Sequence, residues 1–437
     1  MEIKIVRKAG LVLLAALVAL VLNTGKAGAV VDGISGTSFQ LTAQTGYISG
    51  GDGRQIFIWG LANGLGAVQY PGPTLILQAG DIVTVQLTNT LAVNTSIIFP
   101  GMDGVSVAPL DPGVQGLLTS EAPAQVGLVP GTVTYTFTAT NPGTYYYQSA
   151  TNPDLQVEMG LFGAIVVYPA GAVPLPGVST PGQAYGTVDT AYDYEYLFLL
   201  SEMDPSIHEA MEVWAGPPSA LPVNTTDFFA KYWFINGRNG MDDMLDPNVP
   251  YLPTQPYNCL PRVHPGETAL LRVIGMGRDA HPFHTHGNNF LQVAEDGALL
   301  STDGAAADLA KSNFTITMSS GKTADLIWVW TGNGLGWDIY GPDHGAAYPH
   351  ELAADHNQPF PTPIPHVQDI TRGQLYPGSP FLGGSGPLPP GEGGFNPTNA
   401  FTFMFHSHTE KELVNNNIFP GGMMTMMFVE HPDIIIP

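Results

Sequence analysis

Residues 73–87 read Pro73-Thr74-Leu75-Ile76-Leu77-Gln78-Ala79-Gly80-Asp81-Ile82-Val83-Thr84-Val85-Gln86-Leu87. A Gly-Asp turn in this stretch leads into residues 82–87, where apolar and polar side chains alternate in the pattern of a half-buried strand. The same arrangement recurs 186 positions later, where a turn at Gly266-Glu267 leads into the apolar residues 269–273. This internal repeat of a turn and a strand favours two copies of one β-sandwich unit.

The repeat extends beyond this first pair of segments. At the same displacement Ile98-Phe99-Pro100-Gly101 aligns with His284-Thr285-His286-Gly287, whereas residues 147–150 and 405–408 are displaced by 258. We assign the extra residues to an insertion at about 332–400, where Gly and Pro are dense and periodic strands are absent. The predicted organisation is a first domain at 30–169, a linker at 170–191 and a second domain at 192–437 that carries the insertion.

The composition excludes several classes of protein. With 52 Gly, 39 Pro and only 12% charged residues among 437, the chain is not a helical bundle or a coiled coil. Lys and Arg number 14 against 37 Asp and Glu, so the formal net charge is −23 and nucleic acid is not an expected partner. The single cysteine, Cys259, excludes an internal disulfide and a cysteine-rich zinc or iron–sulfur site.

Residues 1–29 have the pattern of a secretory signal peptide. Three basic residues within positions 4–8 precede an apolar run at 9–22, and Ala27-Gly28-Ala29 supplies the small residues of a cleavage site. We expect export to the periplasm or the cell exterior, with a mature chain that begins near Val30 and has no membrane contact after cleavage.

Candidate metal ligands gather in the second predicted domain. Five of the 12 histidines lie in the segments His281-Pro282-Phe283-His284-Thr285-His286 and His406-Ser407-His408. Residues two apart on a strand face the same side, so each H-x-H sequence forms a pair of imidazoles. If the two strands are neighbours, four imidazoles converge, and such a site without a thiolate suits Cu(II) or Zn. Ordinary hydrogen-bonded histidines are the alternative, but two such pairs favour a metal.

These segments resemble those of the multicopper oxidases, which are built from cupredoxin domains. The resemblance rests on H-P-x-H-x-H-G at 281–287, H-x-H at 406–408, P-G-P-T-x-x-x-x-x-G-D at 71–81 and Phe234-Ile235-Asn236-Gly237-Arg238. It implies an all-β fold of two cupredoxin-like Greek-key β-sandwich domains, an oxidoreductase activity and a copper cofactor. One or two copper ions are expected, with Zn or Mn as alternatives. Two-domain relatives commonly form rings of three, which implies a homotrimer.

The sequence departs from this family at the trinuclear copper cluster, which the family holds with eight histidines in four H-x-H pairs. The second-domain half of that set is present as His284, His286, His406 and His408. The first-domain positions hold residues that, apart from the glutamine, cannot ligate copper: Ile98, Pro100, Gln148 and Ala150. The resemblance therefore implies a reduced copper site with one or two ions.

The family's mononuclear blue-copper site, which combines histidines, a cysteine and often a weak axial methionine, is also altered. Ser407 stands in the position of the cysteine and Glu412 in that of the following histidine, so only His281 matches outright. Met424 is a candidate for the axial position, although we favour a final strand whose methionines fill the core. Laccase-type four-electron turnover is not expected, because the family's Cys-His path for electrons is absent.

Glu410 and Glu412 introduce a different possibility. A carboxylate beside His281, or beside the imidazoles, makes a mixed nitrogen and oxygen site for Cu(II), Zn, Mn or Fe, or supplies a general base. A solvated acidic pair balanced by Lys411 is the alternative, and the sequence does not decide between the two. The insertion adds four histidines whose spacing matches no metal template, which favours a polar surface loop over a lid that gathers metal ions. They are His344, His350, His356 and His366.

Three functions of different class follow from these residues. The sequence has no nucleophile elbow, phosphate loop or dinucleotide fingerprint in a suitable context. The first function is an exported oxidoreductase with a reduced copper site and a small-molecule or metal-ion electron donor. The second is copper binding without turnover, for storage or delivery. The third is a metal-free sandwich that serves as a scaffold.

Overall fold

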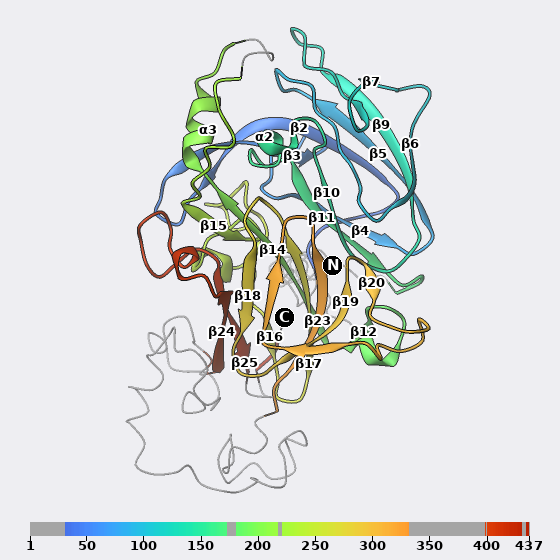
Figure 1. Ribbon diagram of the computed structural model, residues 1–437, viewed down its shortest axis with the longest axis vertical. Helices are drawn as coiled ribbons and strands as arrows, with labels where there is room; N and C mark the ends of the chain where they lie inside the picture. The colour runs from blue at the N-terminus through green and yellow to red at the C-terminus, as the bar shows by residue number, and fades with distance from the viewer. Residues whose placement is uncertain are drawn as a thin grey trace, which may run out of the picture.

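The computed structural model describes residues 31–172, 181–216, 221–331, 398, 400–430 and 434–436. β-Strands dominate these residues and pack as two successive sandwiches (Figure 1), so the predicted all-β fold is confirmed. The expected signal peptide, part of the linker, and almost the whole insertion with its four histidines lie outside the described residues. Within the described ranges, no helix is both long and apolar enough to cross a membrane.

The first sandwich packs a five-stranded sheet on a four-stranded one. Strand β5 (Asp81–Asn89) has the alternation predicted for residues 82–87. Val83, Val85 and Leu87 are fully buried between the sheets, while their neighbours are half-buried or exposed. The five-stranded sheet has the order β3 (Gln55–Asn63), β2 (Ser38–Ser49), β5 (Asp81–Asn89), β9 (Gly131–Ala139), β6 (Asp103–Val107). The four-stranded sheet has the order β1 (Ile34–Ser35), β4 (Gly72–Gln78), β11 (Phe162–Tyr168), β10 (Gly143–Gln148). A small ribbon pairs β7 (Val114–Gln115) with β8 (Ser120–Glu121).

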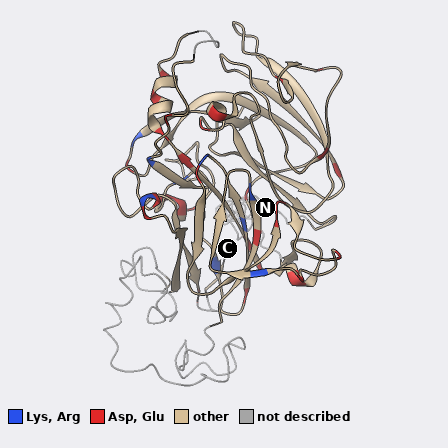
Figure 2. Cartoon of the chain, viewed as in Figure 1, with Lys and Arg blue, Asp and Glu red and all other residues tan. Residues whose placement is uncertain are grey.

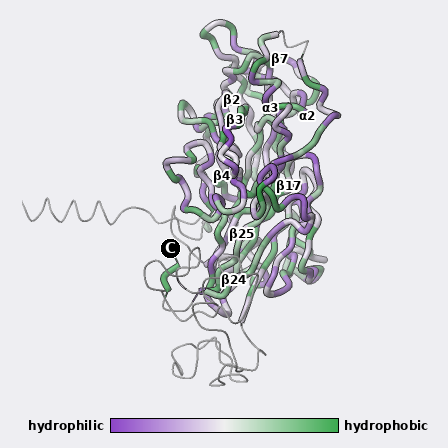
Figure 3. The backbone as a smooth tube through the Cα atoms, turned by 90° about the vertical axis from the view of Figure 1, so that its left-hand side faces the viewer, coloured by the Kyte–Doolittle hydropathy of each residue, from purple (hydrophilic) through white to green (hydrophobic). Residues whose placement is uncertain are grey.

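The second sandwich also consists of two facing sheets, whose core contains Trp328, Phe283 and Phe405. Figure 3 shows hydrophobic residues concentrated on inner strands such as β17. One sheet has the order β15 (Tyr232–Ile235), β14 (Tyr194–Met203), β17 (Thr268–Gly275), β23 (Thr323–Val329), β19 (Phe290–Glu295), β20 (Ala298–Leu299), with β21 (Lys311–Asn313) beside β19. The other has the order β16 (Arg262–Val263), β25 (Met424–Val429), β24 (Phe401–Ser407), β18 (His281–Thr285), β22 (Thr315–Met318).

Short helices and one more ribbon lie in the connections. α3 (Pro205–Glu212) begins at Asp204, whose side chain accepts a hydrogen bond from the backbone N–H of Ser206, and Pro205 occupies the first helical turn. The remaining short elements are α2 (Pro153–Gln156), η1 (Val188–Thr190), η2 (Asp242–Met244), η5 (Glu410–Glu412) and the ribbon of β12 (Gly182–Gln183) with β13 (Ala191–Tyr192).

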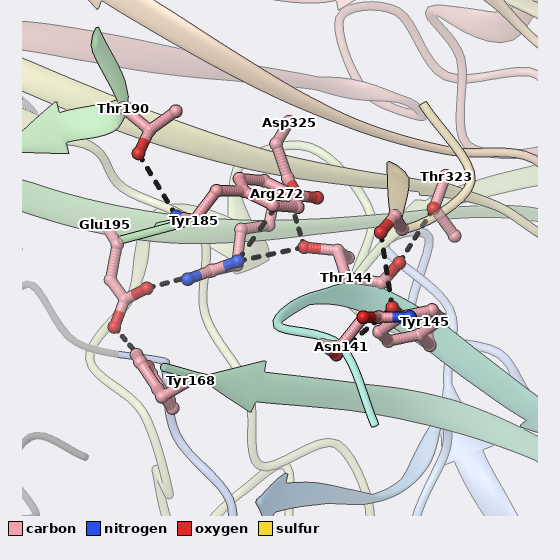
Figure 4. A network of polar contacts seen from close by, with 11 residues as sticks. Asn141, Thr144, Tyr145, Tyr168, Tyr185, Thr190, Glu195, Arg272, Thr323 and Asp325 are labelled. Carbon is pink, nitrogen blue, oxygen red and sulfur yellow. Dashed lines mark hydrogen bonds and ion pairs between the residues drawn. The ribbon is translucent and has the colours of Figure 1, made fainter. Parts of the chain in front are cut away.

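A buried polar network joins the two sandwiches (Figure 4). Nε of Arg272, on β17, donates to Glu195 on β14 at 2.8 Å, and its Nη1 donates to Thr144 on β10 at 3.1 Å. Thr144 in turn donates to Asp325 on β23 at 2.5 Å, and Tyr168 on β11 donates to Glu195. Burial disfavours the charged guanidinium, but the two carboxylates outweigh it and raise the pKa of Arg272 well above its ordinary value.

Acidic residues are more numerous than basic ones along the chain. Figure 2 shows Asp and Glu on many loops and strands, whereas Lys and Arg are sparse.

The strands of the first sandwich fall within residues 34–168 and those of the second within 194–429. The domain boundaries given above remain a prediction.

Candidate metal centre

The two histidine segments form neighbouring antiparallel strands. In the pairing of β18 with β24, His284 lies directly opposite His406, and the flanking residues Phe283 and Phe405 face the sandwich core. The alternation of apolar residues with histidines therefore turns the imidazoles to the outer face of the sheet. We call the four residues on this face the imidazole cluster: His284, His286, His406 and His408.

Three members of the imidazole cluster are close enough to share an ion. One ligand atom from each of His284, His286 and His406 lies within 4.8 Å of the other two. The Nε2 atoms of His286 and His406 are 3.1 Å apart. At this distance either one nitrogen donates a hydrogen bond to the other or both lone pairs point at a cation.

The electrostatic environment keeps these three imidazoles neutral. Burial and the neighbouring imidazoles lower the pKa of His286 to about 4. The same causes, burial first, lower the pKa of His284, and burial is the main cause that lowers the pKa of His406. Neutral imidazole is the form that ligates metals, so the group is ready to bind at neutral pH.

Outer hydrogen bonds orient two of these rings. Nδ1 of His406 donates to the carbonyl oxygen of Ser407 at 2.6 Å, which leaves the lone pair on Nε2. Nδ1 of His284 lies 2.7 Å from the hydroxyl of Thr315, the residue opposite it on β22. Such partners fix the ring and the tautomer of a metal-ligating histidine. The donor set therefore fits a borderline metal such as copper or zinc.

His408 lies at the exposed edge of the imidazole cluster. Its ring centroid is 4.8 Å from that of His284 and 5.6 Å from that of His406. Its backbone N–H donates to the carbonyl of Pro282 at 2.8 Å, which continues the pairing of β18 with β24. It is not one of the three residues whose ligand atoms converge.

Comparisons with known proteins find relatives of part of this chain. A family model described as multicopper oxidase matches residues 62–172. A laccase of Aspergillus fumigatus is 34% identical over 133 residues, which are 30% of this chain and 20% of the laccase. An L-ascorbate oxidase of Cucurbita pepo var. melopepo is 32% identical over 166 residues, which are 36% of this chain and 26% of that enzyme. Residues 62–172 therefore match a multicopper oxidase domain.

Solved structures agree with this fold. A blue copper oxidase from Nitrosomonas europaea has a TM-score of 0.53 at 21% identity, with 91% of this chain and 89% of that chain covered. The multicopper oxidase mgLAC has a TM-score of 0.53 at 19% identity, with 92% and 87% covered. These likenesses concern the fold. The sequence matches span about a quarter or less of the two curated relatives named above.

The first sandwich contains a strand pairing that corresponds to the pairing of the two histidine segments. Ile98 and Gln148 pair through two backbone hydrogen bonds, of 2.9 and 3.2 Å, in the first sandwich. By the displacements in the sequence repeat, this pair is the counterpart of His284 and His406. The first sandwich thus repeats the backbone pairing of the second, with Ile98 and Gln148 at the positions of His284 and His406.

His281, expected as a fifth metal ligand, is not brought to the imidazole cluster. Its ring is fully buried and its two nitrogens contact two carboxylates, Nδ1 with Glu412 at 2.8 Å and Nε2 with Glu202 at 2.9 Å. Burial lowers the pKa of His281, but hydrogen bonds to Glu202 and Glu412 outweigh it and raise the value to about 9. Because the ring nitrogens point in opposite directions, the two carboxylates do not converge on one ion, and a doubly protonated ring offers no lone pair.

The other expected ligands occupy different positions. Glu412 is buried beside His281, whereas Glu410 is exposed. Met424 is buried, but it lies opposite His406 on the outer face of the sheet. Ser407, which stands in the position of the cysteine, lies on the other face. Cys259 is buried, and its Sγ contacts the carbonyl of Leu197 at 3.6 Å.

Sequence reasoning missed two residues that shape these sites. Glu202 lies 79 positions before His281, and no local motif marks it. Thr315 lies on β22, and the register of β22 with β18 brings it opposite His284. Neither residue carries a sequence signal that points to a histidine, because both contacts depend on sheet topology.

Proposed function

We propose that this chain is an exported, copper-binding oxidoreductase of the multicopper oxidase type with a reduced copper site. His284, His286 and His406 hold the ion, and His408 lies beside them for a second one. The observation that carries this proposal is the convergence of three neutral imidazoles on one face of a sheet. The match of residues 62–172 to a multicopper oxidase model supports copper over zinc or manganese.

The residues around the site give it its properties. Copper bound there supplies a one-electron redox couple. Thr315 and the Ser407 carbonyl hold the His284 and His406 rings, so ordering them on binding costs little conformational entropy. The ring of Phe314 contacts His284 edge to face at a centroid distance of 5.6 Å and shields part of the site from water.

A second function, copper binding without turnover, is favoured by the surroundings of His281. In the family this region carries the copper through which electrons enter. Here Ser407 replaces the thiolate, and Glu202 and Glu412 engage both nitrogens of the histidine. Electrons must therefore reach the imidazole cluster directly from a small-molecule or metal-ion donor. Without such a donor the protein stores or delivers copper.

The cellular context and assembly belong to the same proposal. The basic and then apolar pattern of residues 1–29 supports export to the periplasm or the cell exterior. The outer-face position of the imidazole cluster, with His408 exposed, is compatible with a homotrimer in which a neighbouring copy covers it.

The copper content of residues 30–437 after loading and exhaustive dialysis tests the proposal. We expect one or two ions per chain, and their loss in the His284→Ala, His286→Ala variant. The matched control is His264→Gln, because His264 pairs with Glu267 at 2.9 Å and is not a member of the imidazole cluster. Oxidation of an added donor that disappears with the copper supports the oxidoreductase, whereas tight binding without oxidation supports storage. No bound copper in the wild type contradicts both.

A further inference from the structure

A methionine completes the square of side chains that contains the three converging imidazoles. His284 lies opposite His406 in the pairing of β18 with β24. One step along the same face, the backbone N–H of His286 donates to the carbonyl of Met404 at 3.1 Å, so Met404 lies opposite His286. His406 and Met404 are two residues apart on β24 and therefore share a face. Three corners of the square are imidazoles and the fourth is Met404.

Met404 has the accessibility that a ligand needs. It is half-buried, as are His284 and His286 on the same face. Met423 and Met427, by contrast, are fully buried in the core between the two sheets. Cross-strand neighbours lie about 5 Å apart between Cβ atoms, which a flexible thioether spans easily.

Further thioethers continue this face away from the imidazoles. Met424 lies opposite His406, and Met426 lies opposite Met404. Both pack in an apolar group with Met244, against which Met404 also packs. The outer face of the sheet therefore changes from imidazole to thioether across β24, at the two positions His406 and Met404.

The chemistry of this boundary favours one oxidation state of copper. Thioether sulfur is a soft, uncharged ligand that selects Cu(I), whereas imidazole alone accepts Cu(II) and Zn. Three neutral imidazoles and one thioether supply no negative charge to balance the positive charge of the ion. This disfavours Cu(II) more than Cu(I). The apolar side chains that pack against Met404 lower the local polarity, which also favours Cu(I) over Cu(II).

We propose that Met404 is a further ligand residue of the imidazole cluster and that the site binds copper in the cuprous state. The inference rests on the proposed function, because it requires that His284, His286 and His406 hold copper. It adds a sulfur ligand and a preferred oxidation state, which the histidines alone do not give.

The test measures Cu(I) and Cu(II) affinities separately in wild type, Met404→Leu and Met427→Leu. Cu(I) is titrated anaerobically against a chromophoric Cu(I) chelator, and Cu(II) against a Cu(II) chelator. Leucine has a similar volume and lacks the sulfur, and the same exchange at Met427 controls for the change of shape. Loss of an outer partner of a metal ligand already costs ~10–100-fold in affinity, so we expect Met404→Leu to weaken Cu(I) binding at least about tenfold. Cu(II) affinity is expected to stay unchanged, and Met427→Leu, on the opposite face, to alter neither.

The outcomes separate this inference from the proposed function. Wild-type protein that binds neither ion contradicts the proposed function and, with it, this inference. Wild-type protein that binds Cu(II), together with an unchanged Cu(I) affinity in Met404→Leu, overturns this inference alone. An equal loss in Met427→Leu also overturns it, because the effect then comes from packing. Copper–sulfur scattering in the X-ray absorption spectrum of the Cu(I) form, absent in Met404→Leu, supports it directly.

Discussion

Nδ1 of the buried His281 donates to Oε2 of Glu412 at 2.8 Å, although the sequence resemblance assigns this histidine to a mononuclear copper. Glu202 accepts from the other nitrogen at 2.9 Å. A buried cation held between two carboxylates thus joins β14, β18 and η5. Removing one partner of such a buried group leaves an uncompensated charge.

This arrangement predicts a pH-dependent stability. The pKa of His281 is raised from 6.5 to about 9 in the folded protein. Protonated His281 therefore stabilises the folded protein fully below about pH 6.5, and this contribution is lost as the pH rises through about 9. The free energy of unfolding falls by an amount on the order of 3 kcal/mol. Thermal melting between these pH values checks the decline, and an NMR titration of the His281 ring gives the pKa itself.

Two glutamine variants control this measurement. Glu412→Gln removes one of the two carboxylates that contact His281. We therefore expect the loss of stability to begin at a lower pH and the protein to be less stable near pH 7. Glu410 is exposed, and Glu410→Gln is expected to leave the profile unchanged. A wild-type melting temperature that stays level up to about pH 9 contradicts the assignment of a charged His281.

Restoring the family's cysteine alone is expected to fail. Ser407 is fully buried, and its hydroxyl accepts from the backbone N–H of Thr409 at 3.2 Å. A blue-copper site also needs neutral imidazoles, and His281 donates from both nitrogens. We expect no intense blue absorption when copper is added to Ser407→Cys. A blue band in that single variant would show that copper displaces Glu412 or Glu202 from His281.

The candidate site was predictable from the sequence to the extent that it depends on strand periodicity. The two H-x-H segments face one side because residues two apart do so, and the internal repeat brings Ile98 opposite Gln148 as it brings His284 opposite His406. The fate of His281 was not predictable, because Glu202 reaches it from the end of β14 through the arrangement of the two sheets. The position of Met404 likewise depends on register between strands far apart in the chain.

The buried network between the sandwiches predicts a large loss of stability from a small change. Glu195→Gln keeps the shape of the side chain but removes the closest negative charge from the fully buried Arg272. We expect a loss of about 3 kcal/mol in the free energy of unfolding, since breaking a buried pair costs ~3–5 kcal/mol. Urea denaturation followed by tryptophan fluorescence measures the loss.

A surface pair provides the comparison for this network. Lys322 and Glu295 are 3.5 Å apart and partly exposed, so Lys322→Ala is expected to change stability by less than about 1 kcal/mol. Replacing Glu195, Arg272 and Asp325 together by apolar residues is expected to recover part of the loss. Equal effects of Glu195→Gln and Lys322→Ala would mean that solvent screens the Arg272 network.

The hydrogen bond between Nδ1 of His284 and the hydroxyl of Thr315 predicts an effect on copper affinity without loss of a ligand. The hydroxyl lies 2.7 Å from Nδ1 of His284, and Thr315→Val removes it while keeping the side-chain shape. Loss of such an outer partner lowers metal affinity ~10–100-fold, because the ring is no longer held in one tautomer and orientation. Thr317→Val is the matched control, since Thr317 lies on the same face of β22 but opposite Pro282. Competition with a copper chelator measures both variants. A decrease in Thr315→Val alone supports orientation of His284 by the hydroxyl, whereas equal affinities in the two variants contradict it.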